Sequence, residues 1–159
     1  MNLASIKAVA LDVDGVLTDG GVWWSATGDE WKRFCFADVM GVSLAIKAGL
    51  IIALISGEDS PIVDRFAAKF RLTDVVKGCK NKASALADFA SRHNLSSRDV
   101  CFMGDDVNDL EAMKSAGLAA APADSHQSVR DAAAYVTRSG GGRGAVRELI
   151  DAILAARCA

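Results

Sequence analysis

The sequence predicts an α/β fold, a doubly wound parallel sheet with helices on both faces. Two observations predict this fold class. Short apolar runs alternate with segments of helical pattern along the chain, and the run at 50–55 is apolar throughout, as expected of a strand buried on both faces. With 159 residues, 51% of them hydrophobic and 24% charged, the chain is expected to form a single domain over 1–159.

The expected elements have local sequence signals. Asp38 can cap a helix that Gly49 ends, and Ser60 followed by Pro61 is typical of a helix start. In such sheets, ligands bind at the carboxyl ends of the strands. We expect strands at 7–13, 50–55, 75–76, 100–103 and 118–120, and helices at 38–48, 61–70, 82–93, 107–116 and 144–156.

A segment at about 21–36 interrupts this alternation and is typical of a β-hairpin, with its turn at Gly28-Asp29. Trp23 and Trp24 are neighbours on a strand, so their side chains point to opposite faces. A two-stranded hairpin cannot bury both faces by itself. Either one tryptophan packs on the parent domain and the other is exposed, or the hairpin forms a subunit interface; large exposed aromatics favour the interface.

Composition and charge exclude several function classes. Lys plus Arg is 18 and Asp plus Glu is 20, a net charge of -2 that argues against nucleic acid as a partner. The apolar runs are too short to span a membrane, and the first residues lack the pattern of a signal peptide. The 4 cysteines are scattered and form no Cys-x-x-Cys pair, so we expect reduced thiols in a cytoplasmic protein.

The strongest chemical signal is Asp12-Val13-Asp14-Gly15, directly after an apolar strand. Two carboxylates at a strand end repel each other unless a cation lies between them, which suggests Mg²⁺. A carboxylate can also act as a nucleophile and form an aspartyl phosphate. The alternative is a pair of loop acids that cap a helix.

Three further predicted strands are followed by polar residues. Ser56 and Gly57 end the second apolar run, where a hydroxyl and free N–H groups can hold phosphoryl oxygens, although an ordinary turn would look the same. Lys82 opens a predicted helix, where a solvated lysine is the alternative. The segment 103–109 carries more acids than helix capping needs, which again suggests a metal: Asp105, Asp106 and Asp109.

These four strand ends, in this order, resemble the motifs of the haloacid dehalogenase superfamily of phosphotransferases. The resemblance implies that Asp12 attacks phosphorus and that Asp14 protonates the leaving oxygen and then activates water. It implies that Ser56 and Lys82 hold the transferring phosphoryl group. It also places Mg²⁺ between Asp12, the backbone carbonyl of Asp14 and Asp105. The resemblance further implies that the two remaining acids either contact the metal ligands rather than the metal, or assist the metal directly. These acids are Asp106 and Asp109.

The gaps between the motifs leave no room for the cap domain that many members of this superfamily carry. Three segments, 14–20, 28–34 and the glycine-rich 135–148, resemble the capless tetrameric phosphatases of 3-deoxy-2-ulosonate phosphates. This resemblance implies a homotetramer, formed through the hairpin, that acts on a phosphorylated sugar acid. Within the glycine tract, Arg143 could contact substrate; the alternative is a flexible connector.

One position bears on the choice of sugar. The octulosonate branch of these phosphatases usually carries Gly-Arg-x-Ser after the second motif, whereas this chain has Gly57-Glu58-Asp59-Ser60. Glu58 together with Lys69 looks more like the nine-carbon branch, so we expect Gly57, Glu58 and Lys69 to contact substrate. The predicted substrate is a nonulosonate 9-phosphate of the KDN or sialic-acid type, with 3-deoxy-D-manno-octulosonate 8-phosphate of lipopolysaccharide synthesis as the alternative. Glu58 could instead be a solvated acid at a helix start.

Other functions stay open. A tetrameric structural or regulatory domain could retain the fold without activity, but such a domain would tolerate the loss of Asp12 or Lys82, and both are present. A receiver domain of a response regulator needs its phosphoacceptor Asp after the third strand, where none stands. Transfer of the phosphoryl group to another sugar rather than to water is a third alternative.

Overall fold

A computed structural model of the protein describes residues 3–158. Its centre is a six-stranded sheet in the order β5-β4-β1-β6-β7-β8, in which all neighbouring strands are parallel. This sheet confirms the predicted fold class. The strands are β1 (Ala8–Leu11), β4 (Ile51–Ile55), β5 (Val75–Val76), β6 (Val100–Met103), β7 (Leu118–Ala121) and β8 (Tyr135–Val136).

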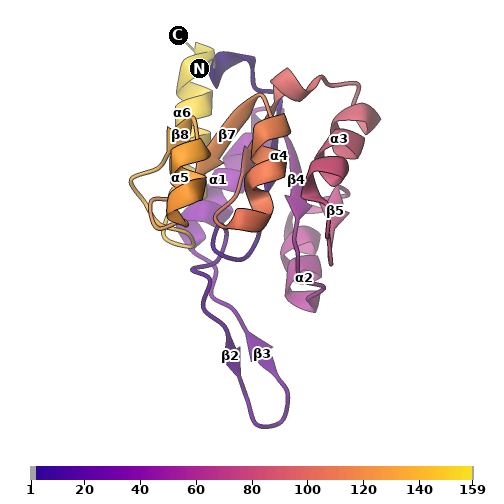
Figure 1. The fold of residues 1–159 in the computed structure, drawn as a ribbon, viewed down its shortest axis with the longest axis vertical. Helices are drawn as coiled ribbons and strands as arrows, with labels where there is room; N and C mark the ends of the chain where they lie inside the picture. Colours follow the sequence, from indigo (N-terminus) through magenta and orange to yellow (C-terminus); the bar gives the residue numbers. More distant parts are fainter. Residues whose placement is uncertain (1–2, 159) are drawn as a thin grey trace.

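Helices cover both faces of the sheet (Figure 1). Successive strand residues point to opposite faces, so Val9 and Leu11 belong to the core beneath α1, α2 and α6, whereas Ala8 and Ala10 face α3, α4 and α5. Nearly all of these strand residues are buried, which explains why the strands are apolar throughout. The helices are α1 (Phe36–Lys47), α2 (Pro61–Phe70), α3 (Lys82–Arg92), α4 (Leu110–Ser115), α5 (Gln127–Ala132) and α6 (Ala145–Cys158).

The start of α2 is as predicted, but that of α1 is not. Ser60 caps α2, since its Oγ accepts the N–H of Ile62 at 3.3 Å. By contrast α1 begins at Phe36, and Asp38 does not cap it. The buried Asp38 carboxylate accepts the backbone N–H groups of Gly144 and Arg147, both at 3.0 Å, and so caps α6 instead. An acid in the first turn of one helix is thus used by another helix that packs beside it.

Two short elements, α5 and β8, were not expected from the sequence, and the predicted helix at 107–116 begins with a 3-10 turn at Val107–Asp109. In α5 only Val129 is buried, which leaves too little periodicity to recognise. The glycine tract is not a flexible connector. Its Gly142 N–H donates to the carbonyl of Val16 at 3.0 Å, which packs the tract against the loop after β1.

The hairpin consists of β2 (Trp23–Trp24) and β3 (Glu30–Trp31), antiparallel and paired Trp23 to Trp31. It projects beyond the sheet and its helices (Figure 1). Trp23, Trp24 and Trp31 are 57%, 73% and 53% exposed, so within one subunit no tryptophan of the hairpin packs on the parent domain. As predicted, no cap domain stands over the sheet in the described part of the chain. Within residues 3–158, no helix combines the length and the apolar character needed to cross a bilayer.

Candidate active site

The predicted strand ends meet at the carboxyl edge of the sheet. The loops after β1, β4 and β6 and the first residue of α3 surround a cavity of about 270 Å³. This convergence follows from the topology, because β1 lies between β4 and β6 in a parallel sheet. The cavity is lined by Asp12, Asp14, Gly15, Gly20, Gly57, Glu58, Lys82, Asp105, Asp106 and Asn108.

Lys82 joins two of the acids. Its Nζ lies 3.0 Å from Oδ1 of Asp12 and 2.6 Å from Oδ1 of Asp109. All three side chains are almost completely buried, so Lys82 is not the solvated lysine of the alternative interpretation. Asn81 places it at the start of α3, because the Asn81 side chain accepts the N–H of Ser84 and caps the helix.

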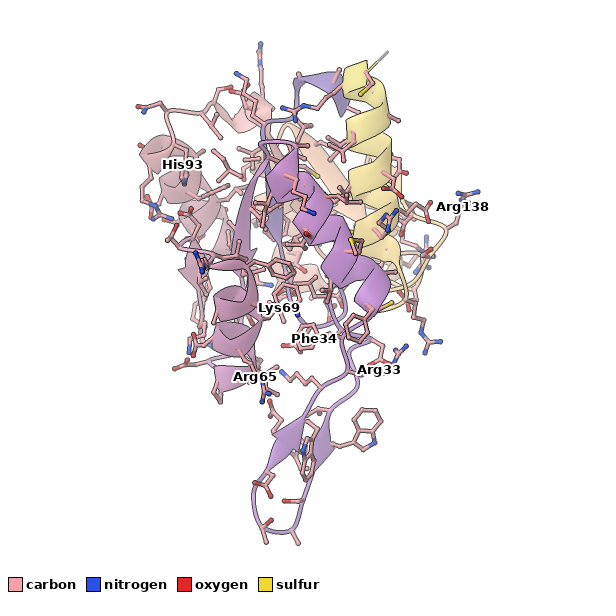
Figure 2. All side chains as sticks on the ribbon, turned by 180° about the vertical axis from the view of Figure 1, so that it is seen from behind. Arg33, Phe34, Arg65, Lys69, His93 and Arg138 are labelled. Atoms are coloured by element: carbon pink, nitrogen blue, oxygen red, sulfur yellow. The ribbon has the colours of Figure 1, made fainter. Side chains whose placement is uncertain are left out.

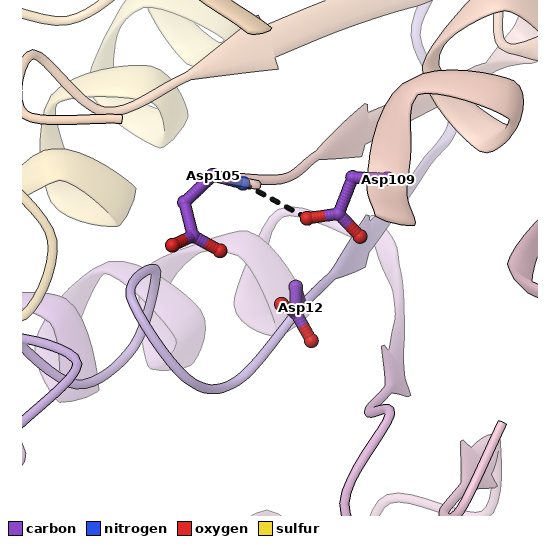
Figure 3. Close-up of side chains that lie close together, drawn as sticks. All are labelled: Asp12, Asp105 and Asp109. Atoms are coloured by element: carbon purple, nitrogen blue, oxygen red, sulfur yellow. Dashed lines mark hydrogen bonds between the residues drawn. The ribbon is translucent and has the colours of Figure 1, made fainter. Parts of the chain in front are cut away.

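Three carboxylates gather next to this lysine (Figure 3). One oxygen each of Asp12, Asp105 and Asp109 lies within 4.8 Å of the others. Asp109 has little capacity left to bind a metal. Its Oδ1 accepts from Lys82, and its Oδ2 accepts the backbone N–H groups of Asp105 and Asp106 at 2.9 and 3.3 Å. Asp109 therefore fixes both the lysine and the loop that carries Asp105.

The crowding of negative charge alters the acidity of the cluster. Burial, followed by repulsion from Asp109, raises the pKa of Asp12 to about 6, although Lys82 opposes the shift. Burial and repulsion from Asp12 raise the pKa of Asp105 to about 8. Burial alone would lower the pKa of Lys82, but Asp12 and Asp109 outweigh it and raise that pKa.

This donor set fits Mg²⁺. Among residues 3–158, Lys82 is the one cation that pairs with any of these acids, and it pairs with Asp12 and Asp109 but not with Asp105. Hard oxygen ligands around an excess of negative charge are what Mg²⁺ prefers. Gly15 permits the close approach: its φ is +79°, and a Cβ there would overlap the Asp105 carboxylate. Asp12 and Asp105 are the side chains that would hold the ion.

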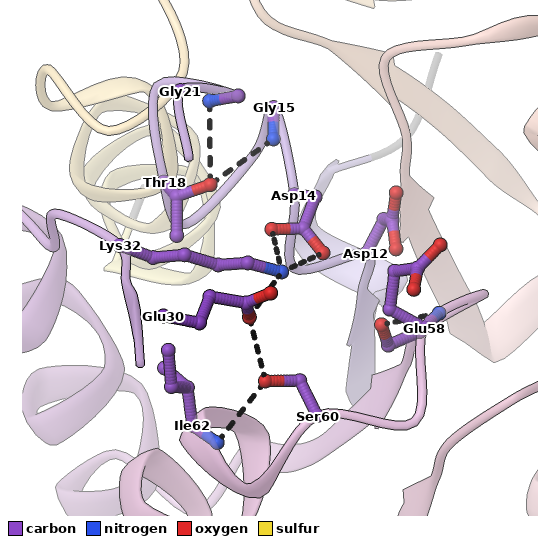
Figure 4. Close-up of polar contacts among 12 residues, drawn as sticks. Asp12, Asp14, Gly15, Thr18, Gly21, Glu30, Lys32, Glu58, Ser60 and Ile62 are labelled. Carbon is purple, nitrogen blue, oxygen red and sulfur yellow. Dashed lines mark hydrogen bonds and ion pairs between the residues drawn. The ribbon is translucent and has the colours of Figure 1, made fainter. Parts of the chain in front are cut away.

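Asp14 lies on the other side of the cavity mouth and points towards the hairpin (Figure 4). Both of its oxygens contact Nζ of Lys32, at 2.9 and 3.0 Å. Lys32 was not among the site residues predicted from the sequence. Glu30 and Lys32 stand two positions apart on an extended segment and therefore share a side of it, a pattern that could have marked the pair.

The second predicted motif is only partly on the cavity wall. Gly57 and Glu58 line the cavity, whereas Ser56 is buried, and its Oγ accepts the N–H of Glu58 at 3.2 Å. Lys69 does not line this cavity. With Arg65 it borders a separate apolar groove of about 270 Å³ (Figure 2). Arg143 is exposed and does not line the cavity either.

The geometry agrees with comparisons to known proteins. Residues 51–149 match the model of the haloacid dehalogenase-like hydrolases. The chain is 37% identical to 3-deoxy-D-manno-octulosonate 8-phosphate phosphatase KdsC of Escherichia coli K12 over 153 residues, 96% of this chain and 81% of that protein. The chain belongs to the haloacid dehalogenase-like hydrolase family. This result confirms the resemblance noted in the sequence and the prediction that the chain is an enzyme of this class.

Solved structures of the family share the whole fold. The structure of 3-deoxy-D-manno-octulosonate 8-phosphate phosphatase from Moraxella catarrhalis, in complex with magnesium, phosphate and KDO, superposes with a TM-score of 0.96 at 32% identity. The superposition covers 99% of this chain and 90% of the Moraxella chain. The cobalt-bound form of the Haemophilus influenzae enzyme gives a TM-score of 0.95 at 35% identity over 99% and 92% of the two chains. Almost the whole chain therefore has a counterpart in these structures.

Proposed function

We propose that this protein is a Mg²⁺-dependent phosphatase that hydrolyses 3-deoxy-D-manno-octulosonate 8-phosphate through an aspartyl phosphate. One observation carries the proposal: Asp12 lies in the cavity at the strand edge, 3.0 Å from the buried ammonium of Lys82 and beside a carboxylate that lacks a cation. A nucleophile for phosphorus needs this environment, since phosphoryl transfer depends on positioning and charge neutralisation. The magnesium ion in the Moraxella structure supports the choice of metal.

In the first step, an oxygen of Asp12 attacks phosphorus, and the bond from phosphorus to the sugar oxygen breaks. Asp14 gives its proton to that leaving oxygen. In the second step, the Asp14 carboxylate takes a proton from water, whose oxygen attacks phosphorus and releases Asp12. Asp12, Asp105 and the backbone carbonyl of Asp14 would hold Mg²⁺, which would neutralise phosphate charge when bound. Lys82 adds a second positive charge, and Asp109 keeps the lysine in place.

The sugar is the finer part of the proposal. The named relatives are 3-deoxy-D-manno-octulosonate 8-phosphate phosphatases, and they favour the eight-carbon substrate over the nine-carbon one predicted from Glu58. A nonulosonate 9-phosphate stays as the second candidate for a specific reason. Glu58 lines the cavity, where a carboxylate stands in place of the arginine typical of the octulosonate branch.

We also propose that the hairpin joins subunits into a homotetramer. Three tryptophans on one small hairpin are more than half exposed, and large apolar patches of this kind mark contact sites. A capless site needs a wall from elsewhere to exclude water from the sugar. A neighbouring subunit would also explain how Lys69, which faces its own groove, could serve substrate binding.

The 4 cysteines are all free, which supports work in a reducing compartment such as the cytoplasm.

A direct test compares the two sugars. We expect wild-type kcat/KM to be higher for 3-deoxy-D-manno-octulosonate 8-phosphate than for a nonulosonate 9-phosphate, with Mg²⁺ present. Glu58→Arg should shift this preference, whereas Asp59→Arg, one residue farther along and exposed, is the matched control. A clear wild-type preference for the nine-carbon substrate would overturn the choice of sugar and leave the phosphatase assignment intact. Phosphate passing to a sugar acceptor, with none released, would instead indicate a transferase.

A further inference from the structure

The hairpin segment reaches back to the wall of the candidate cavity through one lysine, which contacts Asp14. The Lys32 side chain is only 7% exposed, although its neighbours on the hairpin are surface residues. Burial would lower the pKa of Lys32, but Asp14 and Glu30 outweigh it and raise that pKa, so the side chain stays charged. A buried ammonium that contacts both oxygens of Asp14 fixes the plane of that carboxylate.

Asp14 needs such a partner. Its side chain is 29% exposed, and across residues 3–158 Lys32 is the side chain that forms a hydrogen bond or ion pair with it. The torsion that orients a carboxylate is broad, so an unpaired Asp14 would sample many orientations. By contrast, Asp12 is fixed by Lys82 within its own sheet edge.

Lys32 is itself fixed by a second contact chain (Figure 4). Its Nζ lies 3.6 Å from Oε1 of Glu30, and the same oxygen accepts the hydroxyl of Ser60 at 3.1 Å. Ser60 caps α2, so this chain ties the hairpin to the body of the domain. The other Glu30 oxygen accepts the indole N–H of Trp24 at 3.0 Å. We name Asp14, Lys32, Glu30 and Ser60 the hairpin network.

We propose that Lys32 is a positioning residue that orients Asp14 for hydrolysis of the phosphoenzyme. The hairpin would then serve catalysis from within its own subunit, in addition to any role at an interface. The inference rests on the proposed aspartyl-phosphate mechanism. The step concerned is the second one, in which the Asp14 carboxylate accepts a proton from water while the water oxygen bonds to phosphorus and the bond to Asp12 breaks.

The test separates the two steps with 4-nitrophenyl phosphate, whose leaving group needs no proton from Asp14. Stopped-flow absorbance records the first turnover and the later turnovers of wild type and Lys32→Met. We expect Lys32→Met to release the first equivalent of nitrophenolate at the wild-type rate. Later turnovers should slow by about tenfold to a hundredfold, the cost of a misplaced catalytic group.

Two variants serve as controls. Arg33→Met removes the next basic side chain on the same segment, which pairs with Asp19 at 3.1 Å rather than with Asp14, and should behave as wild type. Lys32→Arg keeps a charged donor for both oxygens and should recover most of the later turnovers. If Lys32→Met slows the first and later turnovers equally, or slows neither, the positioning role is refuted.

A structural measurement keeps the two proposals distinct. A wild type that hydrolyses no phosphate monoester with Mg²⁺ would refute the proposed function. Crystal structures of wild type and Lys32→Met still decide the role of Lys32. We expect Asp14 to rotate or to adopt several orientations in the variant, with Asp12 and Lys82 unmoved. An Asp14 that keeps its orientation without Lys32 would overturn the inference.

Discussion

Two lysines hold the two aspartates that we propose to be catalytic, and they do so in different ways. Lys82 comes from the first turn of α3 and lies between Asp12 and Asp109, with its side chain 2% exposed. Lys32 comes from the projecting hairpin and pairs with Asp14, a residue at the cavity mouth. One pair is built within the central sheet and its helices, whereas the other is supplied by an insertion.

The difference suggests how the domain divides its work. The proposed nucleophile, Asp12, is fixed by elements that also form the core, so its position is secured whenever the domain folds. The proposed acid–base residue is fixed by a segment with few contacts to the core, which can change without loss of the fold. Attack on phosphorus would therefore depend on the sheet, and the breakdown of the intermediate on the hairpin.

The largest expected effect is on activity at the sheet edge. Asp12→Asn keeps the volume and loses the nucleophile, so turnover of a sugar phosphate should fall by at least about a thousandfold. Steady-state phosphate release measures it, and circular dichroism checks that the variant folds. Activity near that of wild type would mean that Asp12 is not the group that attacks phosphorus.

The two lysines should differ sharply in their contribution to stability. Lys82→Met leaves two buried carboxylates without their cation, which should lower the free energy of unfolding by about 3–5 kcal/mol in metal-free buffer. Lys32→Met leaves a carboxylate that solvent reaches, so the loss should be about 1 kcal/mol or less. Urea unfolding of both variants measures the contrast. Equal losses of unfolding free energy in the two variants would contradict the distinction between the Lys82 pair in the core and the Lys32 pair from the hairpin.

Mg²⁺ should stabilise the protein more at pH 8 than at pH 6. In the folded state the pKa values of Asp12 and Asp105 are raised, to about 6 and about 8. Without metal, the free energy of unfolding of the protein therefore falls as pH rises from about 4 to 8, because both carboxyls must ionise in the folded state. Metal binds the unprotonated carboxylates, so protons compete with it least at pH 8. Calorimetry at both pH values measures the gain in Tm, which Asp105→Asn should reduce. A gain as large at pH 6 as at pH 8 would contradict the metal site.

The smallest effect on the fold is expected at the hairpin surface. Trp23→Ala with Trp31→Ala removes the exposed cross-strand pair and leaves Trp24 in contact with Glu30. The free energy of unfolding of the subunit should change by less than about 0.5 kcal/mol. Light scattering should nevertheless show a shift from tetramer to smaller species, with Val136→Ala as the control on another exposed strand. A wild type that is already monomeric and active would end the interface proposal.

The contrast between the site built on the sheet edge and the contacts made by the hairpin also explains what could be predicted from the sequence. Residues that follow parallel strands lie at one edge of the sheet, so the sequence predicted that Asp12, Lys82, Asp105 and Asp109 lie near one another, and the family resemblance supplied their roles. Contacts between distant segments left no local pattern. Nothing near Asp14 indicates that its partner is Lys32, 18 residues away on an insertion. Asp38 likewise has its partners at the start of α6, 106 and 109 residues away.

The surroundings of Lys69 within its own chain were not predictable for a related reason. The helix turns Lys69 and Arg65 towards Phe34 and Phe66, so its substrate contact stays a prediction that needs a neighbouring subunit. Which way a helix faces depends on its packing against neighbours rather than on spacing alone. The short α5 and β8 were missed because segments this brief carry no usable periodicity.

The central claim is that the phosphoryl group passes through Asp12. The most direct measurement uses Asp14→Asn, which keeps the nucleophile and slows breakdown of the intermediate. The variant is mixed with ³²P-labelled 4-nitrophenyl phosphate, whose leaving group needs no proton from residue 14, and with Mg²⁺. The reaction is quenched with acid within a fraction of a second, and the labelled peptide is identified. We predict covalent label on the peptide that contains Asp12, and none when Asp12→Asn is added. Product formation without label, or label on another residue, would contradict the mechanism.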